Sequence, residues 1–431
     1  MNRPGCAAIQ PAAIDGAQCL VWDGWMQNLL KPPITSGGSF GPLSPYINAY
    51  LVRIKEQGYA VGSINEQLRV LKRFGRWLKR KGHEVAGLNE GITRDFLGRI
   101  KRSYSDGYAT PALRRLLSVL RQIGAAPEAE TAPPSPTEQL TCSYGRFLLQ
   151  ERNLAAQSVK RLRSVAGRFL AETFGADPLN LSRLTAPDVT AFVQQQAPRH
   201  PSSCRNLVGG TRSFLRYLHY KGLVHTDLSL AVPKVANWAL STLPKHLPAV
   251  QVQKVLRDCD RTTGLGRRNY AILLLLARLG LRAGEVVRLD LEDIDWENAR
   301  IKVCGKGQQW AQLPLPADAA RAIGSYLRRD RPRCACRRVF IRHHAPIQGL
   351  HRNSIANIVR DALANAGIVS ARKGGHLLRH SLATEMLRRG ASIDEIGEVL
   401  RHKCPESTAI YAKVDLKSLR ALALPWPGGA R

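Results

Sequence analysis

The sequence predicts a mostly α protein with a small β component, in which two helical segments precede a larger mixed α/β segment. The length of 431 residues allows two or three domains. Apolar residues recur at three- and four-residue steps through the N-terminal half, as they do in amphipathic helices. The strand candidates, residues 294–296, 300–303 and 312–315, are short, and the last two flank a Gly-Lys-Gly turn. We therefore expect helices to build most of the molecule, with one small sheet in the C-terminal part.

Two proline-rich interruptions divide the chain. Residues 124–137 contain four prolines and no periodic apolar face, and residues 233–248 form a second break. The expected segments are an irregular N-terminal segment over 1–40, a helical module over 41–123, a linker over 124–137, a second helical module over 138–232, a linker over 233–248, a mixed α/β domain over 249–415 and a C-terminal tail over 416–431.

The two helical modules resemble one another at an offset of 95 residues. The aligned pairs are Ala60 and Ala155, Ser63 and Ser158, Ile64 and Val159, Val70 and Val165, Arg73 and Arg168, and Phe74 and Phe169. Both modules are basic, with arginine and lysine between the apolar positions. The matches favour a duplicated helical module. The alternative is a single irregular helical domain in which the likeness is fortuitous.

The charge balance points to a polyanionic partner. The chain has 64 Lys and Arg against 33 Asp and Glu, a formal net charge of +31, which is typical of proteins that bind nucleic acid. Residues 241–431 carry 33 basic and 17 acidic side chains, or +16, and residues 1–240 carry the remaining +15. A lone basic tail would concentrate the charge at one end, whereas a protein that wraps around a polyanion would carry it throughout.

Several other classes are disfavoured. The longest apolar run, residues 270–277, is far shorter than the ~20 residues of a membrane span, and the N-terminus lacks a secretory pattern. Nine scattered cysteines indicate reduced thiols, and hence a cytoplasmic protein. Cys334 and Cys336 precede His343 and His344, but the Cys-x-Cys gap is tight and no second pair follows. We therefore expect neither a metal nor another cofactor.

The mixed domain predicts a series of helices with clear ends. They cover residues 265–279, 353–366, 376–389 and 392–401. Gly280 ends the first, Gly390 supplies a C-cap, and Ser-Ile-Asp-Glu at the start of the last is a capping box. We expect Ser407 or Thr408 to cap a further helix that carries Tyr411.

Some side chains of this domain are suited to a phosphate group. They are Arg282, Lys306, His376, Arg379, His402 and Tyr411, with Glu285 one turn after the first. His376 and Arg379 project from one helix face because they are three residues apart. Each also has a structural explanation: Arg282 could cap the helix that ends at Gly280, and Tyr411 could be a core aromatic. No phosphate-binding Gly-Lys loop and no paired zinc histidines accompany them.

Taken together, these residues resemble the tyrosine recombinase (phage integrase) family over about residues 265–414. The segment HLLRHSLAT, which begins at His376, is similar to the family's His-x-x-Arg signature. The segment VLRH, which ends at His402, is followed nine residues on by Tyr411. Upstream, LGLRAGE over residues 279–285 resembles the family's first-arginine box, and the Gly-Lys-Gly turn at Lys306 resembles its catalytic-lysine hairpin.

The resemblance implies a site-specific DNA recombinase in which Tyr411 attacks a phosphodiester and forms a 3′-phosphotyrosyl link. The implied roles are a phosphate clamp for Arg282 and Arg379, a base for His376, a general acid for Lys306, a hydrogen-bond donor for His402 and an orienting group for Glu285. The planar guanidinium suits the clamp because it binds two oxygens at once, which an ammonium does not. The link conserves the energy of the phosphodiester, so neither ATP nor a metal is required.

The resemblance also implies partners and location. Residues 41–123 would be a DNA-binding module, 138–232 the family's core-binding domain and 249–415 the catalytic domain. The partners would be double-stranded DNA, three further copies of the chain on paired DNA sites, and sibling recombinases. The protein would be the integrase of a mobile element, located in the bacterial cytoplasm at the nucleoid.

Two alternatives stay open. A type IB topoisomerase-like relaxase would share the chemistry, but the two helical modules and the short segment after Tyr411 favour recombination. A non-catalytic or decayed integrase-like accessory protein would bind DNA without cutting it, but the retention of all six candidate side chains argues against decay.

The sequence departs from the family pattern at two places, and its tail has two explanations. Arg401 stands where a glycine usually precedes the histidine, and Gln-Gln-Trp over residues 308–310 replaces a more basic hairpin. In the tail, an apolar stripe at helical spacing consists of Leu416, Leu419, Leu422 and Ala423. The stripe would dock either on its own catalytic domain or on a neighbouring subunit.

Overall fold

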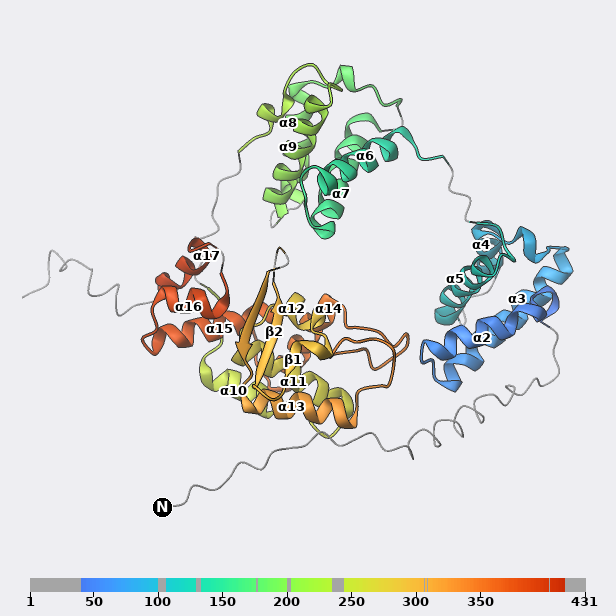
Figure 1. Ribbon diagram of the computed structural model, residues 1–431. Helices are drawn as coiled ribbons and strands as arrows, with labels where there is room; N and C mark the ends of the chain where they lie inside the picture. Colours follow the sequence, from blue (N-terminus) through green and yellow to red (C-terminus); the bar gives the residue numbers. More distant parts are fainter. Residues whose placement is uncertain are drawn as a thin grey trace, which may run out of the picture. The chain divides into compact units, whose positions relative to one another are not determined.

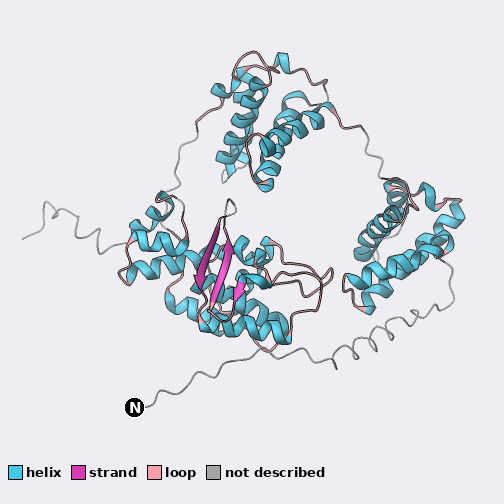
Figure 2. Cartoon of the chain, viewed as in Figure 1, coloured by secondary structure: helices cyan, strands magenta, loops and turns pink. Residues whose placement is uncertain are grey.

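The computed structural model describes residues 40–414 apart from 100–105, 129–132, 176, 200–202, 235–243, 306, 308 and 403. The chain forms two compact units, Met1–Glu130 and Thr131–Arg431, which are described separately (Figure 1). Most described residues lie in helices and a few in one small sheet (Figure 2), which confirms the predicted mostly α class with a small β component. None of the described helices is both long and apolar enough to cross a membrane.

The first unit is a helical module. Its elements are η1 (Gly41–Tyr46), α2 (Ile47–Glu56), α3 (Val61–Lys81), η2 (Val85–Gly87), α4 (Glu90–Arg99) and α5 (Asp106–Gln122). Phe74 and Trp77 of α3 pack into its core with Tyr50 of α2, whose hydroxyl donates a 2.7 Å hydrogen bond to Gln67. Because α3 buries this face, its arginines stay on the opposite, exposed face.

The second unit begins with a helical part that also has four α-helices among its described residues. It comprises α6 (Pro136–Gln150), α7 (Ala156–Phe174), η3 (Leu181–Arg183), α8 (Ala186–Arg199), α9 (Cys204–Tyr220) and η5 (Leu228–Ala231). Ser135 and Glu138 form a capping box that starts α6. Tyr144, Phe169 and Phe214 lie fully buried in its core. In both parts a single 3-10 turn separates the second helix from the third, and so the two share one local topology.

The rest of the second unit is the mixed α/β part. Its elements are α10 (Ala249–Arg257), α11 (Gly264–Arg278), α12 (Ala283–Arg288), η6 (Leu291–Asp293), β1 (Ile294–Asp295), β2 (Arg300–Cys304), β3 (Trp310–Pro314), α13 (Ala317–Arg329), α14 (Arg352–Asn365), α15 (Gly375–Arg388), α16 (Ile393–Leu400), α17 (Glu406–Ala409) and η7 (Ile410–Val414). The three strands form an antiparallel sheet in the order β1-β2-β3, with Ile301 opposite both Ile294 and Leu313. The apolar helix α11 runs through the core, which buries its residues 271–277.

The predicted helices of this part agree with the structure to within a residue or two, and the capping box of Ser392 and Glu395 is present. The prediction for the last helix was wrong. α17 begins at Glu406 after Pro405, Thr408 lies inside it, and Tyr411 lies in the following 3-10 helix. Proline is already fixed near a helical φ and can start a helix without a side-chain cap. The third strand begins two residues earlier than predicted. Residues 1–39 and 415–431 lie outside the described residues.

Candidate active site

Arg379 is anchored between two turns of the backbone. It lies on α15, is only 3% exposed, and donates from its two terminal nitrogens to the carbonyls of Gly280 and Leu400. Gly280 has φ +57°, a left-handed conformation that favours glycine, and a Cβ there would also press on the end of the Leu400 side chain. The planar fork of arginine therefore ties the turn after α11 to the end of α16.

Arg282 is held by the neighbouring carboxylate of Glu285. Its Nη1 donates to Oε1 of Glu285 at 2.8 Å, and its backbone N–H donates to Oε2 at 2.9 Å. A further hydrogen bond of 3.3 Å runs from Nη2 to the carbonyl of Arg401. Burial opposes ionisation of Glu285, but the hydrogen bonds from Arg282 outweigh it and lower the pKa of this carboxyl. Glu285 is thus an ionised, buried group that orients Arg282.

Arg282 and Arg379 belong to one positively charged cluster. Burial, and then the charges of Arg282 and Arg401, lower the pKa of Arg379 to about 9, so the group still carries its charge at neutral pH. The carboxylate of Glu285 opposes the repulsion among these three guanidiniums. An excess of buried positive charge next to a carboxylate is suited to a further anion such as a phosphate.

Tyr411 is fully buried, with 1% of its surface exposed, in a small apolar cluster with Ala383, Ile396 and Leu400. Its hydroxyl oxygen lies 2.8 Å from Nδ1 of His380 on α15. Burial raises the pKa of Tyr411 to about 12, against the opposing effect of Arg379. The hydroxyl is therefore protonated at neutral pH and needs both an acceptor for its proton and a cationic site to become a nucleophile.

His380 is a site residue that the sequence reasoning missed. It follows Arg379 and lies four residues after His376, so it shares a helix face with His376. Burial, and then the charge of His376, lower its pKa to about 4, so its ring is neutral and can accept the Tyr411 proton. The i, i+4 spacing of the two histidines was the signal, but spacing alone does not show which ring reaches the tyrosine.

The two histidines predicted for the site, His376 and His402, both lie near Arg379. Nδ1 of His402 lies 2.7 Å from the buried hydroxyl of Thr408, which orients the ring and leaves Nε2 available for another partner. Burial, and then Arg379, lower the pKa of His402 to about 4. His376 lies at the start of α15, and its side chain is exposed. Partial desolvation of its ring, and then the charge of Arg379, lower the pKa of His376. Lys306 lies outside the described residues.

The lowered pKa values of His380 and His402 predict that the protein becomes less stable as the pH is lowered. His380 and His402 titrate near 4 in the folded chain, against about 6.5 when unfolded. Between these values the unfolded chain binds more protons, so the free energy of unfolding decreases as the pH falls through this window. Denaturant unfolding at about pH 7 and about pH 5 measures the decrease. His380→Asn combined with His402→Asn should flatten it, and an unchanged slope would contradict the assignment.

Comparison with known proteins identifies relatives of this chain. A sequence model described as Phage integrase family matches residues 245–417. The "Putative integrase/recombinase y4rA" of Sinorhizobium fredii is 45% identical over 396 residues, which are 91% of this chain and 96% of that protein. The "Tyrosine recombinase XerD" of Listeria innocua is 31% identical over 279 residues, 62% of this chain and 91% of that protein.

One solved structure shows that the fold is shared. A crystal structure of the XerH site-specific recombinase, bound to a palindromic difH substrate in a post-cleavage complex, covers 68% of this chain and 97% of that chain. The two superpose with a TM-score of 0.54 at 18% sequence identity. Since the family model and two relatives matched over nearly their whole length agree, this chain belongs to the phage integrase family, the tyrosine-type site-specific DNA recombinases.

Proposed function

We propose that this chain is the integrase of a mobile element, which cuts and rejoins duplex DNA through a 3′-phosphotyrosyl intermediate on Tyr411. The observation that carries the proposal is the meeting of Arg282 and Arg379 around the turns at Gly280 and Leu400, with Tyr411 packed against Leu400. The clamp and the nucleophile thus share one structural support. The name "Putative integrase/recombinase" of the relative that matches nearly the whole chain supports an integrase, and the role in a mobile element rests on the family resemblance.

In this proposal the two arginines neutralise the nonbridging oxygens as the phosphate becomes pentavalent. His402, oriented by Thr408, donates a hydrogen bond to the phosphate, and Glu285 holds Arg282 in place. His376 is the proposed base for the tyrosine proton, a role that rests on the family resemblance, while His380 is the ring that holds the hydroxyl in the structure. Lys306 protonates the leaving 5′-oxygen, a role that rests on the family resemblance alone. A second strand's 5′-hydroxyl then attacks the phosphotyrosyl link and restores the DNA.

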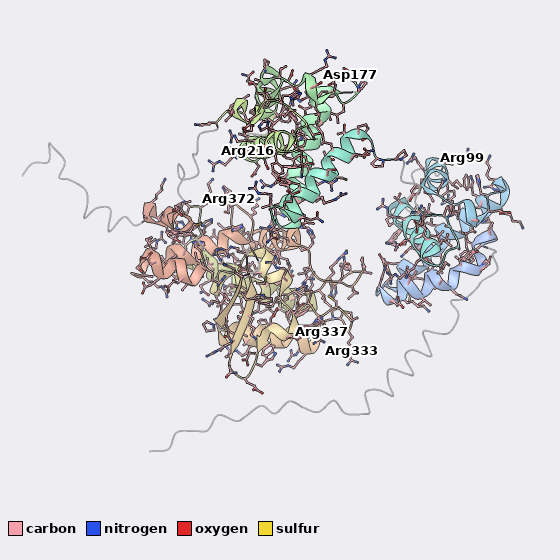
Figure 3. The ribbon with its side chains drawn as sticks, turned by 45° about the horizontal axis from the view of Figure 1, so that its top comes forward. Arg99, Asp177, Arg216, Arg333, Arg337 and Arg372 are labelled. Carbon is pink, nitrogen blue, oxygen red and sulfur yellow. The ribbon has the colours of Figure 1, made fainter. Side chains whose placement is uncertain are left out.

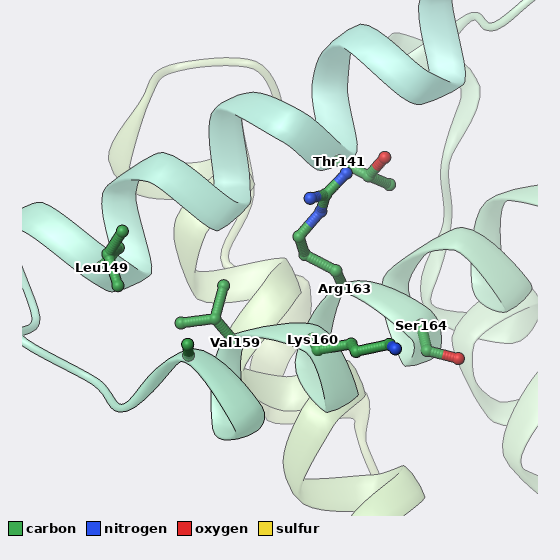
Figure 4. Close-up of a pocket in the computed structure, with 7 residues that line it drawn as sticks. Thr141, Leu149, Val159, Lys160, Arg163 and Ser164 are labelled. Carbon is green, nitrogen blue, oxygen red and sulfur yellow. The ribbon is translucent and has the colours of Figure 1, made fainter. Parts of the chain in front are cut away.

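The helical parts are proposed to hold the duplex through its phosphates. Exposed arginines follow one face of α3 at steps of three and four residues: Arg69, Arg73, Arg76 and Arg80. In the second helical part, Lys160 and Arg163 line an open groove between α6 and α7 (Figure 4). Arg99, Arg216 and Arg372, which lie in three different parts of the chain, are also exposed (Figure 3). Such contacts give affinity without base specificity, so DNA binding should weaken steeply with salt.

Trapping of the covalent intermediate tests the function. A duplex with a nick close to the cleavage site loses the short strand that would reverse the reaction, so a protein–DNA adduct should accumulate. The adduct should form in EDTA without added nucleotide, since the arginines supply the charge stabilisation, and its DNA-linked peptide should contain Tyr411. If no adduct forms although the DNA is bound, the accessory-protein alternative is favoured; if EDTA abolishes cleavage and Mg²⁺ restores it, the proposed chemistry is wrong.

We further propose that four protomers assemble on two DNA sites through the tail, either as copies of this chain or with sibling recombinases. The leucine stripe of residues 416–424 lies outside the described residues, so the proposal rests on the sequence pattern and the family resemblance. A chain truncated after Asp415 should still bind one site but fail to form tetramers on paired-site DNA. Sedimentation measures this, and normal tetramers would show that the tail docks on its own domain.

A further inference from the structure

Arg401 is in an unusual backbone conformation for an arginine. It ends α16 with φ +56° and ψ +50°, in the left-handed region where a helix end usually has glycine. Side chains other than glycine are strained there because the Cβ crowds the backbone. A residue that keeps such strain next to a functional site warrants a functional explanation.

The side chain of Arg401 makes fewer hydrogen bonds than a buried structural arginine would need. It is 14% exposed, and its Nη2 donates to Oε2 of Glu285 at 3.1 Å. Its Nη1 donates to the carbonyl of Val399 at 3.1 Å, but its buried Nε has no hydrogen-bond partner. Burial lowers the pKa of Arg401, and the charge of Arg282 acts in the same direction. A glycine would avoid the strain, the buried donor and the repulsion.

The contacts of Arg401 converge on the phosphate clamp. One oxygen of Glu285 receives the Arg282 side chain, and the other receives the Arg401 side chain. The same turn supplies the carbonyl of Arg401 to Arg282 and the carbonyl of Leu400 to Arg379. Arg401 therefore touches the support of both arginines, through its side chain and through its backbone.

We propose that Arg401 is a positioning residue for DNA cleavage, which fixes the Glu285 carboxylate so that Arg282 stays aligned for the phosphate. This inference rests on the proposed function of Arg282. Its effect requires Glu285: without the carboxylate, Arg401 has nothing to align. The third guanidinium also leaves the cluster with excess positive charge, which a bound phosphate offsets.

The test is a double-mutant cycle between Arg401→Gly and Glu285→Gln on the nicked suicide substrate at saturating DNA. We expect Arg401→Gly to slow cleavage about 10- to 100-fold, the range for loss of one charge-assisted hydrogen bond, with DNA binding almost unchanged. In the Glu285→Gln background, Arg401→Gly should slow cleavage little further. Both substitutions act through the same carboxylate, so their effects on the rate are non-additive. Arg401→Lys keeps the positive charge and a donor nitrogen, so it should cleave faster than Arg401→Gly.

Stability gives an independent readout. Because glycine suits the backbone, the melting temperature of Arg401→Gly should be unchanged or higher while cleavage falls. Ala299→Gly is the matched control: Ala299 also has a positive φ, of +48°, but lies at the turn before β2, so this variant should cleave normally.

Three results would overturn the proposal: cleavage by Arg401→Gly within about two-fold of wild type, effects that multiply with those of Glu285→Gln, or a fall in melting temperature with matching loss of DNA binding. The wild-type adduct at Tyr411 is scored separately, so a failure here leaves the proposed cleavage chemistry standing.

Discussion

Tyr411→Phe should abolish the covalent protein–DNA adduct while leaving DNA binding nearly intact. The substitution keeps the ring in its apolar cluster with Ile396 and Leu400 and removes only the hydroxyl that lies against His380. The folded state should lose about 1 kcal/mol, the usual contribution of one hydrogen bond, so the variant remains folded. Gel separation of the adduct on the nicked duplex, together with a binding titration, measures the two effects.

The control for this variant is a second buried tyrosine of the same part of the chain. Tyr326 lies in the main core beside Phe340 and is as inaccessible as Tyr411, but it contacts none of the arginines of the clamp. Tyr326→Phe should therefore give a normal adduct. An adduct that forms equally well with Tyr411→Phe would remove Tyr411 as the nucleophile.

Much of the fold could be predicted because local sequence determines it. Gly280 and the capping box at Ser392 mark helix ends through backbone geometry that few other residues satisfy. The end of the chain was less predictable. Thr408 is a residue type that often caps helices, but its hydroxyl contacts His402 instead. Tertiary packing, and not the local sequence, determines this contact.

The site could be predicted as a set of residues but not as a network. The step from His376 to Arg379 and the step from His402 to Tyr411 indicate the family. They do not reveal that Arg379 donates to carbonyls on two separate turns. The contact between Arg379 and Gly280 joins segments about one hundred residues apart in the sequence, so it depends on the packing of the whole domain. His380 was missed for the same reason, since only the position of η7 brings Tyr411 to its ring.

Arg379→Lys should lower the cleavage rate about 10²–10³-fold, the effect of removing one preorganised donor from a transition-state clamp. The reason is visible in the anchoring of Arg379: two terminal nitrogens reach two carbonyls, and each carries a second hydrogen for a phosphate oxygen. A single ammonium cannot serve both turns. One buried carbonyl would be left unpaired, so the free energy of unfolding should also fall by about 1–3 kcal/mol.

Arg282→Lys separates clamp chemistry from anchoring. Arg282 is more exposed and its main partner is the ionised Glu285, which an ammonium can also satisfy. We therefore expect a similar loss of cleavage rate but a much smaller loss of stability than for Arg379→Lys. Arg389→Lys is the control at the C-cap of α15, because Arg389 pairs with Glu385 at the surface, where such pairs contribute little. If both clamp variants cleave within a few-fold of wild type, Arg282 and Arg379 are structural arginines, and the stabilisation of the phosphate must come from other residues.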